Sequence, residues 1–509
     1  MKKNLVKVFN APWYLIPFAA YPVLAILSHN ISQVRYTAGI RPLIISIVAA
    51  VLLFLLFRLI YRDWHKAAFA TTAITLLFFT YGHILDLLQQ KWKNLPAIWL
   101  GALWLVFVAL ALVWAGLRQT HFQNAALTLN IISLGLMLYA TSQVIKAEPS
   151  VKQSDKPSDP HALVQSLHIP DGKTPPDIYY IILDSYGRSD LLNSNLQYDN
   201  SAFISELEKM GFYVAKCSQS NYPRTDVSLG SSLNMDYLQN LNDKFTPKNE
   251  DRSQLWQSIL QSTVRYELEN AGYKTVAFAT GFAFTEITTA DVYLSPSQIW
   301  APLNEFEILL MRTTPLRHLE DLGLVNLEQI DVERYRDRTQ LVLNSMQKLA
   351  RMPGPKFIFI HLVIPHPLFV FAPDGSPTDP SQFMDENGIY SQDNYYKGYR
   401  NQAAYISDQM EKAMQTLLAD SANPPVIVMQ GDHGPWLQSG SDQFKILNAY
   451  YLPGHNDLLY PTISPVNTFR LIFDTYLGAD YPQLDNTSYD SPIPYVFNFS
   501  SVPNPCNGH

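Results

Sequence analysis

The sequence predicts a membrane domain of five helices followed by an α/β domain with a doubly wound, mostly parallel sheet. Five long apolar runs lie before residue 145, and short runs of strand formers alternate with helical stretches from about residue 176 onwards. Such alternation is the pattern that builds a parallel sheet with helices on both faces. We therefore expect a transmembrane domain over 1–145, a linker over 146–175, an α/β domain over 176–480 and a C-terminal tail over 481–509.

The apolar runs lie near residues 11–28, 40–60, 67–88, 97–117 and 124–145. Each approaches the roughly 20 residues that a helix needs to cross a bilayer. Buried helices of a large soluble protein are the alternative, but runs such as LIISIVAAVLLFLLF have no polar face to present to water. A cleaved signal peptide is not expected, because the first run lacks a small-residue cleavage site and more runs follow.

Basic residues near the ends of the runs indicate the orientation, because Lys and Arg are retained on the cytoplasmic side. One side carries Lys2, Lys3, Lys7, Arg58, Arg62, Lys66 and Arg118. The other side carries Arg35, Arg41, Lys91, Lys93, Lys146 and Lys152. The bias is small, and it favours a cytoplasmic N-terminus. With five spans, we expect a multi-pass protein of the plasma (inner) membrane whose α/β domain is extracytoplasmic.

The composition argues against some classes of protein. The net charge is -7, and no basic stripe interleaved with aromatic residues occurs after residue 150, so we expect no nucleic-acid partner. The two cysteines, Cys217 and Cys506, do not form a CxxC motif, which excludes a thiolate metal site. In an exported domain they could form a disulfide that ties down the C-terminal tail, or they could remain unpaired thiols.

Acidic and histidine side chains follow predicted strands at their carboxyl ends. The strand candidates read DIYYIILD, YKTVAFAT, KFIFIHLV and PVIVMQGD, and each is a nearly continuous apolar run, as expected of a strand covered on both faces. Asp184 closes the first strand, and Asp432 and His433 close the fourth. Ligands of open α/β sheets bind at such ends, although an isolated Asp can instead cap the next helix. Gly431 and Gly434 would let the backbone turn sharply around the Asp-His pair.

Two carboxylates and an imidazole from separate segments suit zinc or manganese better than calcium. A divalent metal at Asp184, Asp432 and His433 would make a nearby hydroxyl easier to deprotonate. Thr225 offers that hydroxyl, because Pro223 prevents helix before it and a helical pattern follows. The start of this helix would also attract a phosphate or sulfate. An ordinary N-cap threonine is the alternative.

The order of a strand-ending Asp, a hydroxyl that opens a helix and a late DHG resembles the alkaline phosphatase superfamily, in particular its sulfatase-like branch. Five spans followed by an exported domain of this kind are similar to lipoteichoic acid synthases and lipid A phosphoethanolamine transferases. The resemblance covers residues 1 to about 480. It implies an alkaline phosphatase/sulfatase-like α/β domain and a metal-dependent enzyme of the cell envelope.

The resemblance also implies a role for each matching residue. Asp184, Asp432 and His433 match metal ligands, and Thr225 matches the nucleophile, which also contacts the metal. The spacing TDVS resembles the T-x-x-S of the phosphoethanolamine transferases and puts Ser228 one turn inside the helix.

His366, in IHLVIPHPLF, resembles a histidine of these families that contacts the phosphate group of the substrate. Three features depart from the pattern. Asp184 stands where the transferases usually have Glu, and DHGPW stands where they commonly have DHGES. The stretch TDVSL replaces the C-x-P-S-R of sulfatases, which argues against cleavage of sulfate esters. His455 is the candidate ligand for a second metal, although a histidine on a surface loop is the simpler interpretation.

These features predict a membrane-anchored, metal-dependent phosphotransferase. Thr225 would accept the head-group phosphate of a membrane phospholipid donor and pass it to a glycan or lipid acceptor, with a divalent metal, Zn or Mn, as cofactor. Two alternatives remain. The first is a hydrolase of phosphodiesters or sulfate esters, in which water takes the group. The second is a binding module that recognises anionic glycans without chemistry, and the complete set of Thr, two Asp and His weighs against it.

Overall fold

The computed structural model describes residues 11–30, 36–91, 97–117, 122–147, 157–170, 172–296, 303–385 and 388–508. The chain divides into two compact units. The first contains Met1–Lys152 and Ser297–Ile330, and the second contains Gln153–Pro296 and Asp331–His509. The segment Ser297–Ile330 therefore lies within the α/β stretch of the sequence but packs with the N-terminal helices, a grouping that the sequence pattern does not reveal.

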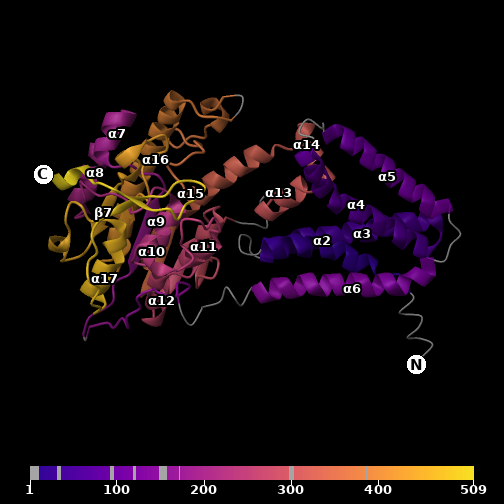
Figure 1. Ribbon diagram of the computed structural model, residues 1–509, viewed down its shortest axis with the longest axis horizontal. Helices are drawn as coiled ribbons and strands as arrows, with labels where there is room; N and C mark the ends of the chain where they lie inside the picture. The colour runs from indigo at the N-terminus through magenta and orange to yellow at the C-terminus, as the bar shows by residue number, and fades with distance from the viewer. Residues whose placement is uncertain are drawn as a thin grey trace. The chain divides into compact units, whose positions relative to one another are not determined.

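The first unit contains the predicted apolar helices (Figure 1). They are α2 (Leu15–His29), α3 (Ile40–Tyr61, after the 3-10 turn η1, Tyr36–Gly39), α4 (Trp64–Lys91), α5 (Ala97–Leu117) and α6 (Phe122–Ala147). Helices α3 to α6 are long and apolar enough to cross a membrane. Helix α2 has 15 residues and is shorter than the predicted run 11–28, because regular helix starts only after Pro12 and Tyr14.

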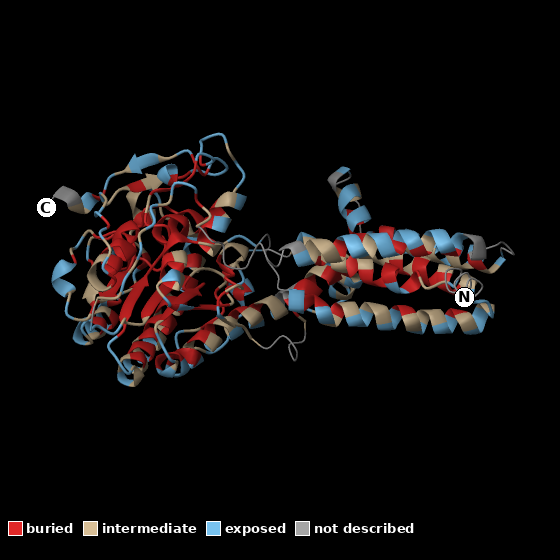
Figure 2. Ribbon diagram, turned by 90° about the horizontal axis from the view of Figure 1, so that it is seen from below, coloured by how far each residue is buried: buried red, intermediate tan, exposed pale blue. Residues whose placement is uncertain are grey.

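Large apolar side chains stay exposed along these helices, which Figure 2 shows in the long helices of the first unit. Leu59, Leu117 and Trp99 are examples, with exposed fractions of 77%, 78% and 69%. Exposed apolar patches of this extent are not found on soluble monomers. The helices therefore have outer surfaces suited to the hydrocarbon of a bilayer.

The segment Ser297–Ile330 adds short helices to the first unit: α13 (Glu305–Arg312), η4 (Pro315–Arg317) and α14 (His318–Asp321). A capping box between Asn304 and Glu307 starts α13, and Glu307 also accepts hydrogen bonds from Arg41 at the start of α3. The N–H of Gly82 in α4 donates to the carbonyl oxygen of Thr313 at 3.1 Å. A Cβ at Gly82 would lie 2.6 Å from Thr313, so only glycine permits this approach.

A seven-stranded sheet forms the centre of the second unit, in the order β2-β7-β6-β1-β5-β3-β4. The strands are β1 (Ile178–Leu183), β2 (Tyr213–Val214), β3 (Lys274–Phe278), β4 (Val292–Leu294), β5 (Lys356–Leu362), β6 (Val426–Gln430) and β7 (Asn448–Tyr451). Strands β6, β1, β5, β3 and β4 are parallel, and β7 and β2 join in antiparallel pairing. The predicted strands correspond to β1, β3, β5 and β6, which confirms the mostly parallel sheet.

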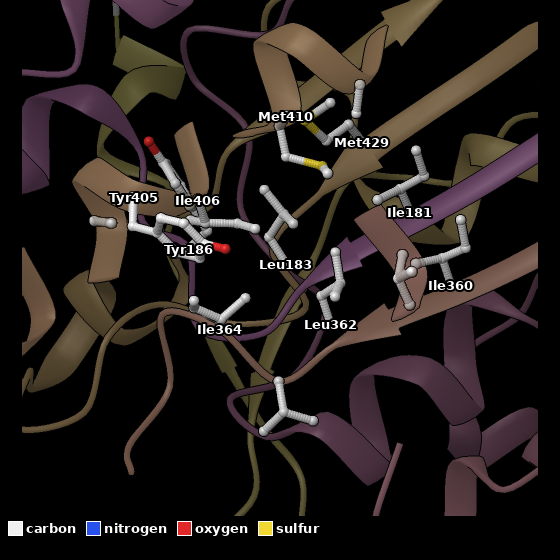
Figure 3. Close-up of a cluster of buried hydrophobic side chains, with 14 of the residues drawn as sticks. Ile181, Leu183, Tyr186, Ile360, Leu362, Ile364, Tyr405, Ile406, Met410 and Met429 are labelled. Atoms are coloured by element: carbon white, nitrogen blue, oxygen red, sulfur yellow. The ribbon is translucent and has the colours of Figure 1, made fainter. Parts of the chain in front are cut away.

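Helices cover both faces of this sheet, as predicted. Successive residues of a strand point to opposite faces. The odd-numbered residues of β1 belong to a buried cluster with the helices within 189–209, 327–351 and 392–420. The even-numbered residues belong to a second cluster with the helices within 225–232, 263–270 and 468–476. Figure 3 shows part of the first cluster, in which Leu183 and Leu362 lie near Ile406 and Met410.

The helices of the second unit follow the strands in βα order. They are α7 (Ser189–Leu196), α8 (Ser201–Lys209), α9 (Thr225–Ser232), α10 (Leu238–Leu241), α11 (Ser253–Leu260), α12 (Thr263–Asn270), α15 (Leu327–Arg351), α16 (Gln392–Asp420) and α17 (Thr468–Tyr476). The tail forms a separate two-stranded sheet from β8 (Ser488–Asp490) and β9 (Ser500–Val502). A disulfide joins Cys217 to Cys506, with a Cα–Cα distance of 5.8 Å, so the tail is fixed to the α/β unit and the question that the sequence leaves open is answered.

Candidate metal centre and active site

Asp184, Asp432 and His433 come together where the neighbouring strands β1 and β6 end. One ligand atom from each residue lies within 4.8 Å of the others. The Nε2 atom of His433 lies 3.5 Å from Oδ1 of Asp184 and 3.7 Å from Oδ2 of Asp432. All three side chains are buried. The predicted metal ligands are therefore brought together at the carboxyl edge of the sheet.

The backbone at this edge is shaped by close approaches. Ser185 has a positive φ of 67°, an unusual conformation for a residue other than glycine, and its N–H donates to Oδ1 of Asp432 at 3.0 Å. A Cβ at Gly431 would lie 2.3 Å from the carbonyl oxygen of Tyr186, and one at Gly434 would lie 2.7 Å from another carbonyl oxygen. The two glycines are thus needed for close packing of the backbone. The backbone also bends at Asp432 and His433, between the two glycines, as the sequence suggests.

A hydrogen bond fixes the tautomer of His433. Its Nδ1–H donates to the carbonyl oxygen of Gly434 at 2.7 Å, so in the neutral imidazole Nε2 carries the lone pair. That lone pair faces the two carboxylates, and the hydroxyl of Thr225 lies 3.3 Å away. The imidazole is therefore presented in the form that binds a metal ion.

The carboxylates leave oxygen atoms that fit a cation. Oδ1 of Asp184 and Oδ2 of Asp432 are buried, and neither has a hydrogen-bond partner among the residues that the structure describes. Burying a charged oxygen without a partner is costly, and such groups in proteins are usually paired or bound to metal. Two carboxylates and one imidazole nitrogen form a donor set that suits Zn²⁺ or Mn²⁺.

The electrostatics of the site also favour a cation. Burial by itself lowers the pKa of His433, but the charges of Asp432 and Asp184 outweigh burial and raise it above its ordinary value. Burial likewise raises the pKa of Asp184, but His366, His361 and His433 outweigh burial and lower it. The lowered pKa of Asp184 favours its ionised form, which attracts positive charge to the point where the ligand atoms converge.

Thr225 is the first residue of α9, where Pro223 led us to expect a helix to start. Arg224 occupies the N-cap position in extended backbone, so the interpretation of Thr225 as an ordinary N-cap is wrong. The Thr225 hydroxyl instead faces Nε2 of His433. Ser228 lies one turn further along α9 and is buried. Both hydroxyl residues of the TDVS motif therefore lie on the helix that begins beside the cluster of Asp184, Asp432 and His433.

His366 lies half-buried in the loop after β5, at the mouth of the site. Its charge is close enough to Asp184 to lower the pKa of that carboxyl group. The His366 ring packs edge-on against Trp436 at a centroid distance of 4.6 Å and against Phe282 at 6.3 Å. Trp436 is 47% exposed. The DHGPW motif thus places an exposed aromatic side chain against His366.

Two other histidines differ in their relation to the site, and His455 follows the simpler interpretation of a histidine on a loop. His361 is inside β5, and its Nε2 lies 3.2 Å from Oδ2 of Asp184 while its Nδ1 lies 3.1 Å from the hydroxyl of Thr285. The sequence analysis missed it, although a histidine within an apolar strand was a signal. His455 lies on a separate loop, with its ring against Tyr476 at 5.3 Å. Within the described part of the chain, it does not belong to the group of potential metal ligands formed by Asp184, Asp432 and His433.

Arg224 is a further residue that the sequence analysis did not single out. It precedes Thr225 directly, and its charge acts on His433. Its two terminal nitrogens donate to the main chain and the hydroxyl of Ser491. Its Nε–H is buried and has no hydrogen-bond partner within the described part of the chain. This N–H is therefore a donor available to an anion beside Thr225.

A scan of family models gives a match to the sulfatase family over residues 176–464, more than half of the 509-residue chain. The chain belongs to the sulfatase family. The resemblance to the sulfatase-like branch of the alkaline phosphatase superfamily is thereby confirmed, and the protein is a sulfatase-like phosphotransferase or hydrolase. No curated protein matches the sequence.

The fold of this sulfatase-family chain is similar to several solved structures. The C-terminal periplasmic domain of EptC from Escherichia coli is 14% identical, with a TM-score of 0.41, and the match covers 68% of this chain and 97% of that chain. Lipooligosaccharide phosphoethanolamine transferase A (EptA) from Neisseria meningitidis is 13% identical, with a TM-score of 0.37, over 92% of this chain and 93% of that chain. BT1596, a 2-O GAG sulfatase, is 12% identical, with a TM-score of 0.40, over 62% and 77%.

Proposed function

We propose that this membrane-anchored protein transfers the head-group phosphate of a phospholipid to a glycan or lipid acceptor through a phospho-threonine intermediate. One observation carries the proposal: the Thr225 hydroxyl faces the buried centre of Asp184, Asp432 and His433 at the start of a helix. A hydroxyl in that position is suited to nucleophilic attack on an anionic ester. The apolar helices of the first unit favour a lipid as the donor, because a soluble substrate would need no anchor.

The metal would be held by Asp184, Asp432 and His433, next to Thr225. When bound, a divalent cation at these ligands would offset phosphate charge and lower the pKa of a neighbouring hydroxyl. The presence of Thr225 in place of the cysteine or serine of the C-x-P-S-R motif favours phosphate esters over sulfate esters as substrates.

The proposed transfer has two chemical steps, and both use the hydroxyl of Thr225. Oγ1 of Thr225 forms a bond to the phosphorus of the head-group phosphodiester, and the bond from phosphorus to the diacylglycerol oxygen breaks. Diacylglycerol leaves with the proton that Thr225 loses. In the second step, an acceptor hydroxyl attacks the phosphorus, the bond to Oγ1 breaks, and the acceptor's proton returns to Thr225. Transfer to water in this second step would give the hydrolase.

Arg224 and His366 would position the phosphate. The free Nε–H of Arg224 is a charged donor beside the nucleophile, and charged donors form the stronger hydrogen bonds to phosphate oxygens. His366 lies at the mouth, with its ring oriented by Trp436. Both residues would therefore hold the anionic group while Thr225 attacks.

The proposal is tested by the products of the purified full chain in phosphatidylcholine liposomes that contain phosphatidylethanolamine. We expect diacylglycerol to be released from phosphatidylethanolamine and head-group phosphate to be recovered on an added glycan acceptor. An aryl sulfate serves as the matched control substrate and should not be cleaved. Free phosphoethanolamine in place of a modified acceptor would support the hydrolase, and cleavage of the sulfate alone would refute the proposal.

We further propose that the second unit is extracytoplasmic, as the basic residues predict. Arg41 at the start of α3 and Asp86 near the end of α4 pair with Glu307 and Arg317 of the segment Ser297–Ile330. The start of one span and the end of the next lie on the same side of a membrane. Arg41 was assigned to the extracytoplasmic side from the sequence, so the docked segment belongs on that side too.

Protease accessibility tests this topology. In intact spheroplasts, a tag placed after His509 should be removed by external protease, because the C-terminal tail belongs to the second unit. A tag placed before Met1 should be protected until the membrane is opened. Protection of both tags would show that the second unit is cytoplasmic, and the lipid-donor proposal would then need revision.

A further inference from the structure

A largely apolar cavity of about 350 Å³ lies within the first unit. Its walls come from α2, α3, α4 and the segment Ser297–Ile330, with Val23, Ala49, Phe78 and Leu310 as representative side chains. Small-molecule sites in proteins have volumes of roughly 300–1,000 Å³, so the cavity is large enough to hold a ligand. The site described above, in the second unit, does not include any of these residues.

The polar side chains in the lining are already bonded to the protein. The hydroxyls of Ser46, Thr75 and Thr314 donate to main-chain carbonyl oxygens at 2.7, 2.9 and 3.2 Å. The carboxylate of Glu307 accepts hydrogen bonds from Arg41. The hydroxyl protons of the lining are thus used within the protein, and most of the remaining lining residues are apolar. An apolar occupant therefore fits the cavity best.

The cavity has the depth of one leaflet of a bilayer. On α3 its lining begins at Pro42, at the start of the helix, and extends to Leu53. At 1.5 Å per residue this is a depth of roughly 16 Å, about half of a hydrocarbon core that is roughly 30 Å thick. The lining residues Ile45 and Leu316 are 58% and 39% exposed, so the cavity is open to its surroundings.

We propose that this cavity binds one acyl chain of a membrane phospholipid. The chain would enter alongside α3, and the head group would remain at the level of α13, where the ion pair of Arg41 and Glu307 lies. A phospholipid is favoured because α3 and α4 are of membrane-spanning length and carry exposed apolar side chains, so hydrocarbon surrounds the opening. The role of this lipid as the phosphate donor rests on the proposed function. The binding of the lipid in the cavity does not depend on that function.

Photolabelling of the full chain in phosphatidylcholine nanodiscs tests the proposal. The probe is phosphatidylethanolamine with a photoreactive diazirine at the middle of one acyl chain. We expect the label on the peptide that contains residues 303–316, because these residues line the cavity. Ala49→Trp fills the cavity from an exposed lining position, and we expect it to lower this labelling roughly tenfold, equivalent to about 1.4 kcal/mol of binding.

Val48→Trp is the matched control, because Val48 is the neighbouring exposed residue of α3 and does not line the cavity. Its labelling should stay at the wild-type level. Ile45→Trp and Ile44→Trp form a second pair, with exposed fractions of 58% and 56%, of which only Ile45 lines the cavity. Equal labelling within both pairs, or label spread evenly over all apolar helices, would overturn the inference and indicate bulk lipid alone.

Two outcomes separate this inference from the proposed function. Thr225→Ala should label as the wild type does, because Thr225 lies outside the cavity. Specific labelling without any release of diacylglycerol would leave the lipid site in place and remove the donor role. Release of diacylglycerol without specific labelling would support the transferase and contradict the cavity as a lipid site.

Discussion

Replacing Thr225 with Ala is expected to abolish turnover of phosphatidylethanolamine while leaving the fold intact. The substitution removes the hydroxyl that lies 3.3 Å from Nε2 of His433, whereas the hydroxyl of Ser185 lies on the Nδ1 side of that ring. We expect kcat to fall by roughly 10³-fold or more, as for other enzymes that lose a nucleophile. Because Arg224 is the N-cap, the change in unfolding free energy should stay below about 1 kcal/mol.

The covalent adduct gives a second measurement on the same residue. Wild-type protein incubated with phosphatidylethanolamine and no acceptor should carry a head-group phosphate on the peptide that contains Thr225, detected by mass spectrometry. Ser228→Ala is the matched control, because Ser228 belongs to the same motif but lies one turn further along α9. An adduct on Ser228 would move the nucleophile by one turn. Full activity in both variants would refute the covalent mechanism.

Loss of metal is the expected result of Asp432→Asn and of His433→Ala. Each substitution removes one ligand from the cluster in which Asp184, Asp432 and His433 converge. We expect close to one equivalent of zinc or manganese in the wild type by elemental analysis and little in either variant. Adding the metal back to wild-type protein that a chelator has stripped should also raise its melting temperature, since a ligand at 100 times its Kd stabilises the folded state by about 2.7 kcal/mol.

His455→Ala serves as the control for the metal experiment, because its ring packs on Tyr476 outside the cluster. It should keep the metal content and the activity of the wild type. Full metal occupancy in both ligand variants would show that the centre has been misplaced. A wild-type protein that neither retains nor responds to metal would favour the binding module, which has no need of a cation.

The sequence predicted the site where local pattern and sheet geometry agree. Asp184 and Asp432 follow apolar runs that ended as strands, and β1 and β6 turned out to be neighbours in the sheet. Carboxyl ends of parallel neighbours meet at one edge, so the two aspartates had to approach each other. The start of α9 at Thr225 could also be predicted from the sequence, because Pro223 limits where a helix can begin.

Other features depend on long-range packing that no local pattern reports. In the sequence, His361 is only one residue of a buried strand. Its place beside the site follows from the pairing of β5 with β1, in which His361 is opposite Ile182. Arg224 has no distinctive context in the sequence, and its free donor becomes visible only when Ser491 of the tail engages its terminal nitrogens. The positive φ of Ser185, directly after β1, was not foreseen, because propensity does not indicate a strained residue that its surroundings hold in place.

The docking of Ser297–Ile330 on the first unit has a consequence for biosynthesis. Translation must reach residue 330 before the whole segment can pack on the membrane helices. By then β1 to β4 have been synthesised, whereas β5 and β6 have not. The two units therefore mature in an interleaved order, and neither can finish before the other has begun. A fragment that starts near residue 153 would also carry this segment without its partners, and Phe306 and Leu310 would lose the cover that residues such as Val23 provide in the whole protein.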